Sequence, residues 1–465
     1  MLKRPALVGL IALAACDGGA GPTTAVVEAV PLAVRTQNAP QAAVVGTPFD
    51  YDATRGGAAF SGGSGSLSYA VAFAPSANGL SASAGRITGR PEAAGTITVT
   101  LTARDNLGAT ATQSFAVVAF SADLGSPRLP FAPHAYSDAR VPLPQHFLAD
   151  GPGGSVFSTD NTPPGNPTTD AGATLGRVLF YDRRLSANDR VSCGSCHQQS
   201  RAFSDSLRFS RGFAGELTGR RGMSLVNARF YDNGRFFWDE RAATLEVQVL
   251  QPIQDSVEMG MRLDDAVLKV GLTAYYPALF QAAFGTPEVT SDRISRALAQ
   301  FIRSMTSTGS RFDQAFAGSA VPNFAAVFTD REQRGQQLFE SSGCAQCHTT
   351  HAQVGNQPRN NGLPGTIRDQ GAGAGRMKVP SLRNVAVRPP YMHDGRHSSL
   401  WAVVNFYNAG VQDTPNLDPL LRTPDGRVRR LNLTEEERDA LVAFLGTLTD
   451  PAFLTAEKFS DPFPG

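Results

Sequence analysis

The sequence predicts a multidomain protein in which a small all-β sandwich precedes two mainly α domains. Three observations support this order. Residues 97–103 alternate with a period of two, residues 291–305 and 434–448 repeat apolar side chains with a helical period, and a Cys-x-x-Cys-His motif occurs twice. The expected division is 1–16 signal, 17–40 tether, 41–120 sandwich, 121–150 linker, 151–325 first helical domain and 326–465 second helical domain.

The composition is that of a globular protein. Hydrophobic residues make up 42% of the 465 residues and charged residues 18%, which is enough apolar material for several cores. The formal net charge is +1. Nothing in the charge therefore indicates a nucleic-acid partner.

The first sixteen residues indicate export. Lys3 and Arg4 precede an apolar run from residue 6 to residue 15, which is too short to span a bilayer. The segment 13–16, Leu-Ala-Ala-Cys, resembles the cleavage box of bacterial lipoproteins. We therefore expect a periplasmic protein with a lipid anchor to the membrane on Cys16; the alternative is a plain signal peptide that contains a cysteine.

The β region resembles known surface modules. A turn at residues 105–108 separates the alternating segments 97–103 and 113–118. The segments GLSASAGRITGRP (79–91) and LTARDNLGATATQSFAV (101–117) resemble immunoglobulin/cadherin-like domains of bacterial surface proteins. Gly85 and Gly89 are expected in turns, and the module is expected to act as a spacer or docking element.

The remaining chain is predicted to be helical with long loops. Residues 434–448 begin with a capping box made by Thr434 and Glu437. Helix-like stretches at 173–181 and 330–339 precede the two cysteine motifs. This is the arrangement of small class-I cytochrome c-like domains, used twice.

The two cysteine motifs predict covalent haem c. In such a motif two thioethers fix the porphyrin, and the adjacent histidine is aimed at the iron. A thioredoxin-like redox pair and a zinc site are the alternatives. The motifs consume all four cysteines that follow the signal, out of five in the chain, which favours two haems. The attachment residues are Cys193, Cys196 and His197, and Cys344, Cys347 and His348.

The second axial ligand of each iron decides between electron transfer and reaction with peroxide. Between Gln198 and Phe237 there is no histidine, and the only methionine is Met223. The first haem is therefore expected to have an open face. The alternative is that His134, His146 or Met223 reaches the iron.

Four segments carry a resemblance to a known family. They are LGRVLFYDRRLSANDRVSCGSCH (175–197), FFWDERAATLEVQVLQPIQDSVEMG (236–260), RGQQLFESSGCAQCH (334–348) and KVPSLRNVAVRPPYMHDGR (378–396). They resemble the dihaem bacterial cytochrome c peroxidase/MauG family over about two thirds of the chain.

The resemblance implies roles for residues near the first haem. Trp238 matches the tryptophan that carries electrons between the haems, and Glu258 matches the distal carboxylate that acts as acid and base on peroxide. Gln248 matches the distal glutamine, and Pro252 a residue of the distal pocket wall.

The second haem distinguishes the branches of the family. In ordinary members a methionine follows the histidine of the His-Asp-Gly segment by fourteen residues and ligates the second iron. Here that position, counted from His393, is Tyr407, as in MauG-like members. A phenolate is a hard donor that should lower the haem potential. Met392 is the competing ligand.

Family members often bind calcium between the haems through an asparagine side chain and backbone carbonyls. In this chain Arg221 stands where the asparagine is expected, which argues against calcium. Arg388 and Pro390 could still offer carbonyls.

The resemblance implies an enzyme that reduces hydrogen peroxide at the first haem with electrons passed through the second. A small cytochrome c or a copper protein would be the donor. In the MauG-like variant, which Tyr407 favours, a residue of a partner protein, commonly tryptophan, is oxidised instead. The alternative from another class is a non-enzymatic dihaem electron carrier, whose irons would both be six-coordinate and low-spin.

Overall fold

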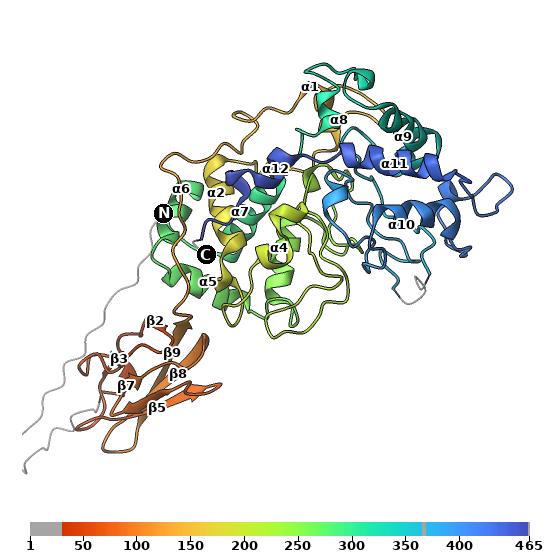
Figure 1. Cartoon of the computed structure of the whole chain (residues 1–465). Helices are drawn as coiled ribbons and strands as arrows, with labels where there is room; N and C mark the ends of the chain where they lie inside the picture. Colours follow the sequence, from red (N-terminus) through yellow and green to blue (C-terminus); the bar gives the residue numbers. More distant parts are fainter. Residues whose placement is uncertain (1–29, 365–368, 464–465) are drawn as a thin grey trace, which may run out of the picture.

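A computed structural model describes residues 30–364 and 369–463 of the chain. The predicted signal and Cys16 lie outside these residues. Figure 1 shows the strands gathered at one end of the molecule and the helical region extending away from them. The multidomain architecture expected from the sequence, a β-sandwich followed by helical domains, is confirmed.

The sandwich consists of two main sheets that enclose an apolar core. One sheet has the strand order β2-β9-β8-β5, with β2 parallel to β9, and the other has the order β3-β7-β6. Val99, Leu101 and Val117 are fully buried between the sheets. The strands are β1 (Ala33–Val34), β2 (Gln41–Val44), β3 (Phe49–Asp52), β4 (Phe60–Ser61), β5 (Ser68–Ala74), β6 (Leu80–Ser83), β7 (Arg86–Gly89), β8 (Gly95–Arg104) and β9 (Thr110–Phe120).

Two details of the sandwich differ from expectation. The short strand β1 lies within the expected tether and pairs with β4, so ordered structure begins before residue 41. Gly85 lies in the β6–β7 turn with φ 81°, as predicted, but Gly89 is paired in β7 opposite Phe49. A side chain at Gly89 would collide with the backbone of Gly79, which explains the glycine without a turn.

The helical region has two main cores. The predicted helices at 173–181, 291–305, 330–339 and 434–448 are confirmed as α2, α7, α9 and α11, and the capping box of Thr434 and Glu437 is present. The helices are α1 (Gln145–Leu148), α2 (Asp170–Tyr181), α3 (Cys193–Cys196), α4 (Leu245–Gln254), α5 (Leu263–Leu272), α6 (Tyr276–Phe284), α7 (Ser291–Arg303), α8 (Arg311–Gln314), α9 (Asp330–Ser341), α10 (Leu400–Asn405), α11 (Glu435–Thr447) and α12 (Pro451–Thr455).

Each core is built on one close helix pair. Helix α2 packs against α7 at Gly176, where an added Cβ would lie 2.0 Å from the carbonyl oxygen of Ala297. Helix α9 packs against α11 at Gly335 in the same way, 1.9 Å from the carbonyl oxygen of Ala440. The helices that precede the two cysteine motifs are therefore held by the same kind of contact.

The end of the chain returns to the first helical core. Phe453 and Phe459 are buried in the core that contains α2 and α7. Tyr181 donates a hydrogen bond to the carbonyl of Phe459 at 2.6 Å, and Arg177 donates one to the carbonyl of Ser460 at 2.7 Å. The residues after α11 thus complete the first core, although they belong to the expected second domain.

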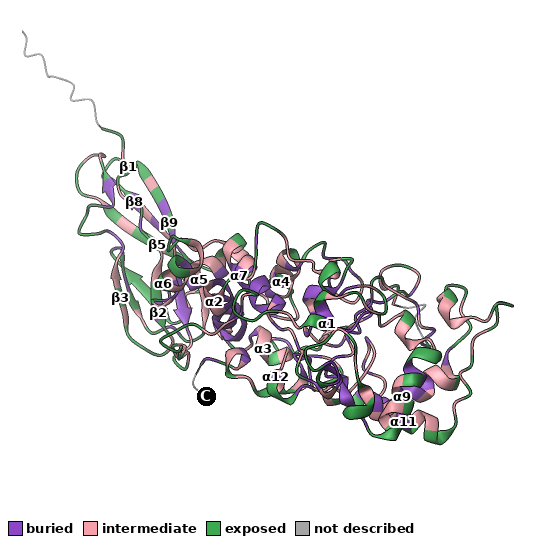
Figure 2. Ribbon diagram, turned by 90° about the horizontal axis from the view of Figure 1, so that it is seen from above, coloured by how far each residue is buried: buried purple, intermediate pink, exposed green. Residues whose placement is uncertain are grey.

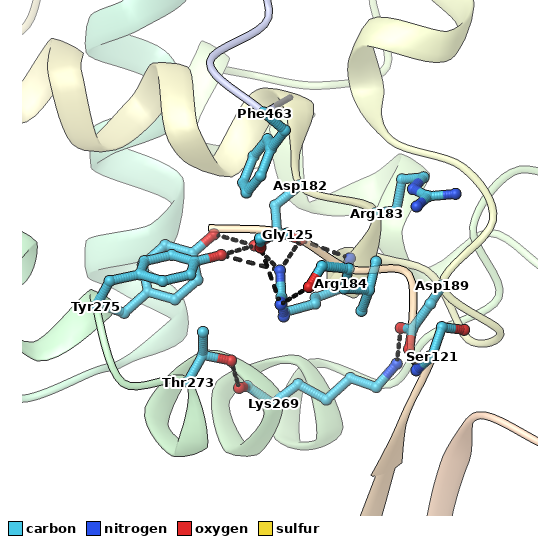
Figure 3. Close-up of polar contacts among 12 residues, drawn as sticks. Ser121, Gly125, Asp182, Arg183, Arg184, Asp189, Lys269, Thr273, Tyr275 and Phe463 are labelled. Carbon is cyan, nitrogen blue, oxygen red and sulfur yellow. Dashed lines mark hydrogen bonds and ion pairs between the residues drawn. The ribbon is translucent and has the colours of Figure 1, made fainter. Parts of the chain in front are cut away.

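The segment that follows the sandwich is fixed to the first helical domain by a buried polar network (Figure 3). The backbone N–H of Ser121 donates to Asp189 at 2.9 Å, and Asp189 forms a buried ion pair with Lys269. Nearby, Arg184 donates to the carbonyls of Leu124 and Gly125 at 3.3 and 3.2 Å. The sandwich is therefore joined to the helical region by an anchored connection.

Within 30–364 and 369–463, no helix is long and apolar enough to cross a membrane. Figure 2 shows that the strands carry many exposed and intermediate residues, whereas α7 is largely buried within the helical region.

The contact at Gly335 predicts the effect of a small substitution. Replacing Gly335 with alanine should lower the free energy of unfolding by about 1–3 kcal/mol, because the added methyl group must displace the backbone of α11. Gly271→Ala in α5 is the matched control, since no atom lies within 4 Å of its added Cβ, and it should be neutral or stabilise by up to about 1 kcal/mol. Thermal unfolding followed by circular dichroism tests both; equal melting temperatures would contradict the packing argument.

Candidate haem centres

Both cysteine motifs form one helical turn that ends at the histidine. The first motif lies on α3, and the backbone N–H of His197 donates to the carbonyl of Cys193 at 2.9 Å. The second lies on a 3₁₀ turn, η6 (Cys344–Gln346), and the N–H of His348 donates to the carbonyl of Cys344 at 3.0 Å. The chain therefore presents two cysteines and a histidine with the same local geometry twice.

The first motif borders a cavity of about 400 Å³, called here the first cavity. The Nδ1–H of His197 donates to the carbonyl of Phe203 at 2.9 Å, and burial lowers the pKa of the imidazole. The ring is thus neutral, with the Nε2 lone pair available to a metal. The lining includes Cys196, His197, Trp238, Gln248, Pro252 and Glu258.

Glu258 reaches the first cavity from the loop after α4. The carboxylate of Asp255 accepts the backbone N–H of Glu258 at 3.0 Å, and Gly212 allows the loop to approach, because a Cβ there would lie 1.6 Å from the carbonyl oxygen of Val257. Burial, with a smaller effect of Asp255, raises the pKa of Glu258 to about 7. A carboxyl group with this pKa can both accept and donate a proton near neutral pH.

The second motif borders a separate cavity of about 240 Å³, the second cavity. Burial lowers the pKa of His348 to about 4, so its imidazole is also neutral. Both candidate ligands for the opposite side, Met392 and Tyr407, line this cavity together with Cys344 and Cys347.

The two candidate ligands lie beside one amide. The Nδ2 group of Asn361 donates to Tyr407 Oη at 3.2 Å and lies 3.8 Å from Met392 Sδ. Burial raises the pKa of Tyr407 to about 12, and the hydrogen bond from Asn361 opposes this shift. Asn361 can therefore stabilise negative charge on the phenol oxygen.

One wall separates the two cavities. Arg221, Trp238 and Lys378 line both of them. The indole Nε1–H of Trp238 donates to the carbonyl of Arg221 at 2.8 Å, and its ring lies edge-on to His393 with the ring centroids 6.3 Å apart. Trp238 is thus held in position between the cavities from two sides.

The two halves repeat the same backbone around this wall. Phe236 bridges to Ala242 in the first half, and Tyr391 bridges to His397 in the second. Thr244 then caps α4 and Ser399 caps α10.

The repeat exposes the main difference between the cavities. Eight residues after the cap the first half has Pro252, whereas the second half has Tyr407, in a π-helical turn (Phe406–Gly410). Proline offers no side-chain ligand, and tyrosine does. The two cavities therefore differ at this position of the repeated scaffold, with Pro252 lining the first and Tyr407 the second.

Two of the three alternative ligands for the first iron lie outside the first cavity. Neither His134 nor His146 lines the first cavity; His146 is buried against Asp313 at 2.9 Å. Met223 lines both cavities, and its backbone lies close enough to His197 to influence the pKa of that imidazole. Met223 therefore stays an alternative ligand of the first iron.

Sequence reasoning missed three residues of these cavities: Asn361, Lys378 and the side chain of Arg221. Asn361 lies outside every segment that carried the resemblance. Lys378 lies inside one of them but bears no motif that marks a buried amine over the rings of Tyr231 and Phe236. Neither Arg221 nor Lys378 forms a salt bridge in the part of the chain that the structure describes.

The residues present fit two covalently bound haem c groups. Each cavity joins a motif turn, a neutral histidine and a largely apolar lining. The buried cations of Arg221 and Arg388 line the second cavity, and the Nε of Arg221 has no hydrogen-bond partner. Such cations suit a group that carries two carboxylates.

Comparison with known proteins agrees with this fit. The family description "Di-haem cytochrome c peroxidase" matches residues 170–321, "Cytochrome c" matches residues 332–449, and an Ig-domain family matches residues 31–119.

Individual relatives cover most of the helical region. Methylamine utilization protein MauG of Methylorubrum extorquens is 35% identical over 305 residues, 63% of this chain and 82% of that protein. Cytochrome c551 peroxidase of Nitrosomonas europaea is 32% identical over 290 residues, 60% of this chain and 79% of that protein. The crystal structure of a MauG-like protein associated with microbial copper homeostasis matches with a TM-score of 0.55 and 31% identity, over 65% of this chain and 96% of that one.

Proposed function

The chain belongs to the dihaem cytochrome c peroxidase family, which includes the MauG proteins and whose members are haem oxidoreductases, and from this premise we propose that it reduces hydrogen peroxide at the first cavity. The observation that carries the proposal is the contrast between Pro252 and Tyr407 at equivalent positions of the repeated scaffold. A haem held by His197 would offer an open coordination position to peroxide.

The residues of the first cavity have separate roles in cleaving the O–O bond of peroxide. Cleavage requires a proton to move from the inner to the outer oxygen of peroxide. The carboxylate of Glu258 takes this proton and returns it, as its pKa near 7 allows. Gln248 orients the peroxide by hydrogen bonding, and Pro252 keeps the wall free of competing ligands.

Electrons reach the first cavity through the shared wall. Trp238 lines both cavities and is fixed by its hydrogen bond to Arg221, and its aromatic ring suits it to pass electrons between them. His348 and Tyr407 would hold the second haem, and the Asn361 amide, which donates to Tyr407 Oη, would stabilise the phenolate.

Tyr407 favours the MauG-like variant, in which a residue of a partner protein supplies the electrons. As a hard anionic ligand, the Tyr407 phenolate would stabilise oxidised iron and so favour a longer-lived oxidised protein. The second candidate is peroxide removal with a small cytochrome c or copper protein as donor, which Met392 as ligand would favour.

The proposal also covers the cellular location of the protein and the roles of its domains. Residues 1–16 direct the chain to the periplasm and Cys16 anchors it to a membrane. The sandwich acts as a spacer, the 151–325 domain carries the peroxide-reacting haem, and the 326–465 domain carries the electron-transfer haem.

The spin state of the ferric protein tests the function. An open first iron predicts a high-spin signal in electron paramagnetic resonance, together with consumption of hydrogen peroxide in the presence of a reductant. A non-enzymatic electron carrier predicts two low-spin irons. Low-spin signals from both haems at every redox poise would rule out the proposed peroxidase.

The pKa of Glu258 predicts the pH dependence of turnover. The pKa is raised to about 7, so the carboxyl is protonated below that pH and cannot take the proton from peroxide. The kcat/KM for peroxide should therefore rise with pH through about 7 and then level off. Glu258→Gln should lower kcat/KM about 10²-fold or more and abolish this rise.

The exposed carboxylate of Glu288 provides the control for this experiment. Glu288→Gln removes the charge of an exposed carboxylate that lines neither cavity, so it should leave the pH profile unchanged. An unaltered profile in Glu258→Gln would assign the proton transfer to another group.

Matched variants decide between the two candidate ligands of the second iron. Tyr407→Phe removes the phenolate and should shorten the lifetime of the peroxide-oxidised protein, measured by stopped-flow absorption, whereas Met392→Leu should leave it unchanged. The reverse pattern would identify Met392 as the ligand and favour peroxide removal over the MauG-like variant.

A further inference from the structure

Arg221 is a buried arginine in the wall that the two cavities share. Arg221 is 5% exposed and lines both cavities. The hydrogen-bond acceptors of its guanidinium are neutral: the carbonyl of Asp205 at 2.6 Å, the carbonyl of Arg388 at 3.0 Å, the hydroxyl of Ser204 at 3.3 Å and the carbonyl of Gly222 at 3.3 Å. Among the described residues its guanidinium forms no salt bridge, so its charge is not cancelled by a bonded carboxylate.

Both the backbone and the side chain of Arg221 form hydrogen bonds to other segments of the chain. Its backbone N–H donates to the carbonyl of His393 at 2.8 Å, and its own carbonyl accepts the indole N–H of Trp238 at 2.8 Å. Its guanidinium reaches Asp205 on one side and Arg388 on the other. The positive charge is therefore fixed at one place, between segments of both helical domains.

The residues at this place do not fit calcium. Calcium takes six to eight oxygen ligands, and the expected set includes the carbonyl of Arg388 and an asparagine oxygen at position 221. The Arg388 carbonyl already accepts from the guanidinium, and an arginine side chain offers donors only. In the part of the chain that the structure describes, no group of three or more His, Cys, Asp or Glu side chains could hold a metal ion.

We propose that the guanidinium of Arg221 takes the place of the divalent cation between the haems. A fixed positive charge beside two irons favours their reduced states and so raises both reduction potentials. The buried position limits screening by salt. Because this cation is part of the chain, the redox properties of the protein do not depend on calcium.

The charge persists at neutral pH. Burial lowers the pKa of Arg221 to about 10, which still leaves the side chain protonated at pH 7. A second buried arginine, Arg388, lines the second cavity and donates to the carbonyl of Ser381, so the positive potential extends along this wall.

Redox titration of the complete holoprotein tests the role of the charge. Arg221→Asn should shift the reduction equilibrium of both haems about tenfold toward the oxidised form, which is about 59 mV lower for a one-electron couple. Arg221→Lys keeps the charge and should retain the wild-type potentials. Arg211→Asn, which removes an exposed arginine of the same loop, is the matched control and should have no effect.

Metal analysis of the wild-type protein tests whether calcium is absent from this place. Protein dialysed against buffer with calcium chloride should retain no calcium, and neither EGTA nor added calcium should move its potentials. One tightly held calcium per chain, or unchanged potentials in Arg221→Asn, would overturn the proposal. The wild-type measurement decides even where Arg221→Asn does not fold. These readouts need no turnover, so their failure is distinguishable from failure of the peroxidase function.

Discussion

The hydrogen bond from the indole of Trp238 to the carbonyl of Arg221 holds together the wall on which both haem centres depend. Arg221 in turn binds the segment that leads to the second cavity through the carbonyls of Arg388 and His393. Trp238 is the aromatic residue among the six that line both cavities, and its ring is held in place by this hydrogen bond. If this hydrogen bond were lost, Trp238 could move, and the distance and rate of electron transfer between the two centres would change.

Duplication of one scaffold explains how a single chain supports two different centres. The bridge, the helix cap and the eight-residue spacing are the same in both halves, and the first difference lies at the position that holds Pro252 in one half and Tyr407 in the other. Chemistry therefore depends on side chains placed on a common backbone. The carboxyl of Glu258 adds the second difference, since burial brings its pKa to about 7.

Much of this organisation was predictable from the sequence, where the signal is local. Haem attachment follows from a five-residue motif, and α11 follows from its capping box and apolar spacing. Trp238, Gln248, Glu258 and Tyr407 could be assigned roles through the family resemblance, and the structure brings them to the two cavities. Their chemical roles remain predictions.

What the sequence could not provide depends on long-range contacts. Nothing near Asn361 indicates that its amide lies beside Tyr407 and Met392. The acceptors of the Arg221 guanidinium come from segments on both sides of it, the most distant 167 positions along the chain. Gly89 was expected in a turn because a glycine in a strand has no local explanation; the reason is the close backbone of Gly79.

The return of the chain end to the first core has a consequence for the independence of the two helical domains. Phe453 and Phe459 complete the core around α2 and α7, although they follow the second core in the sequence. The second core, by contrast, is built from residues up to Leu448. Removal of the residues after α11 would therefore open the core of the first domain rather than that of the second.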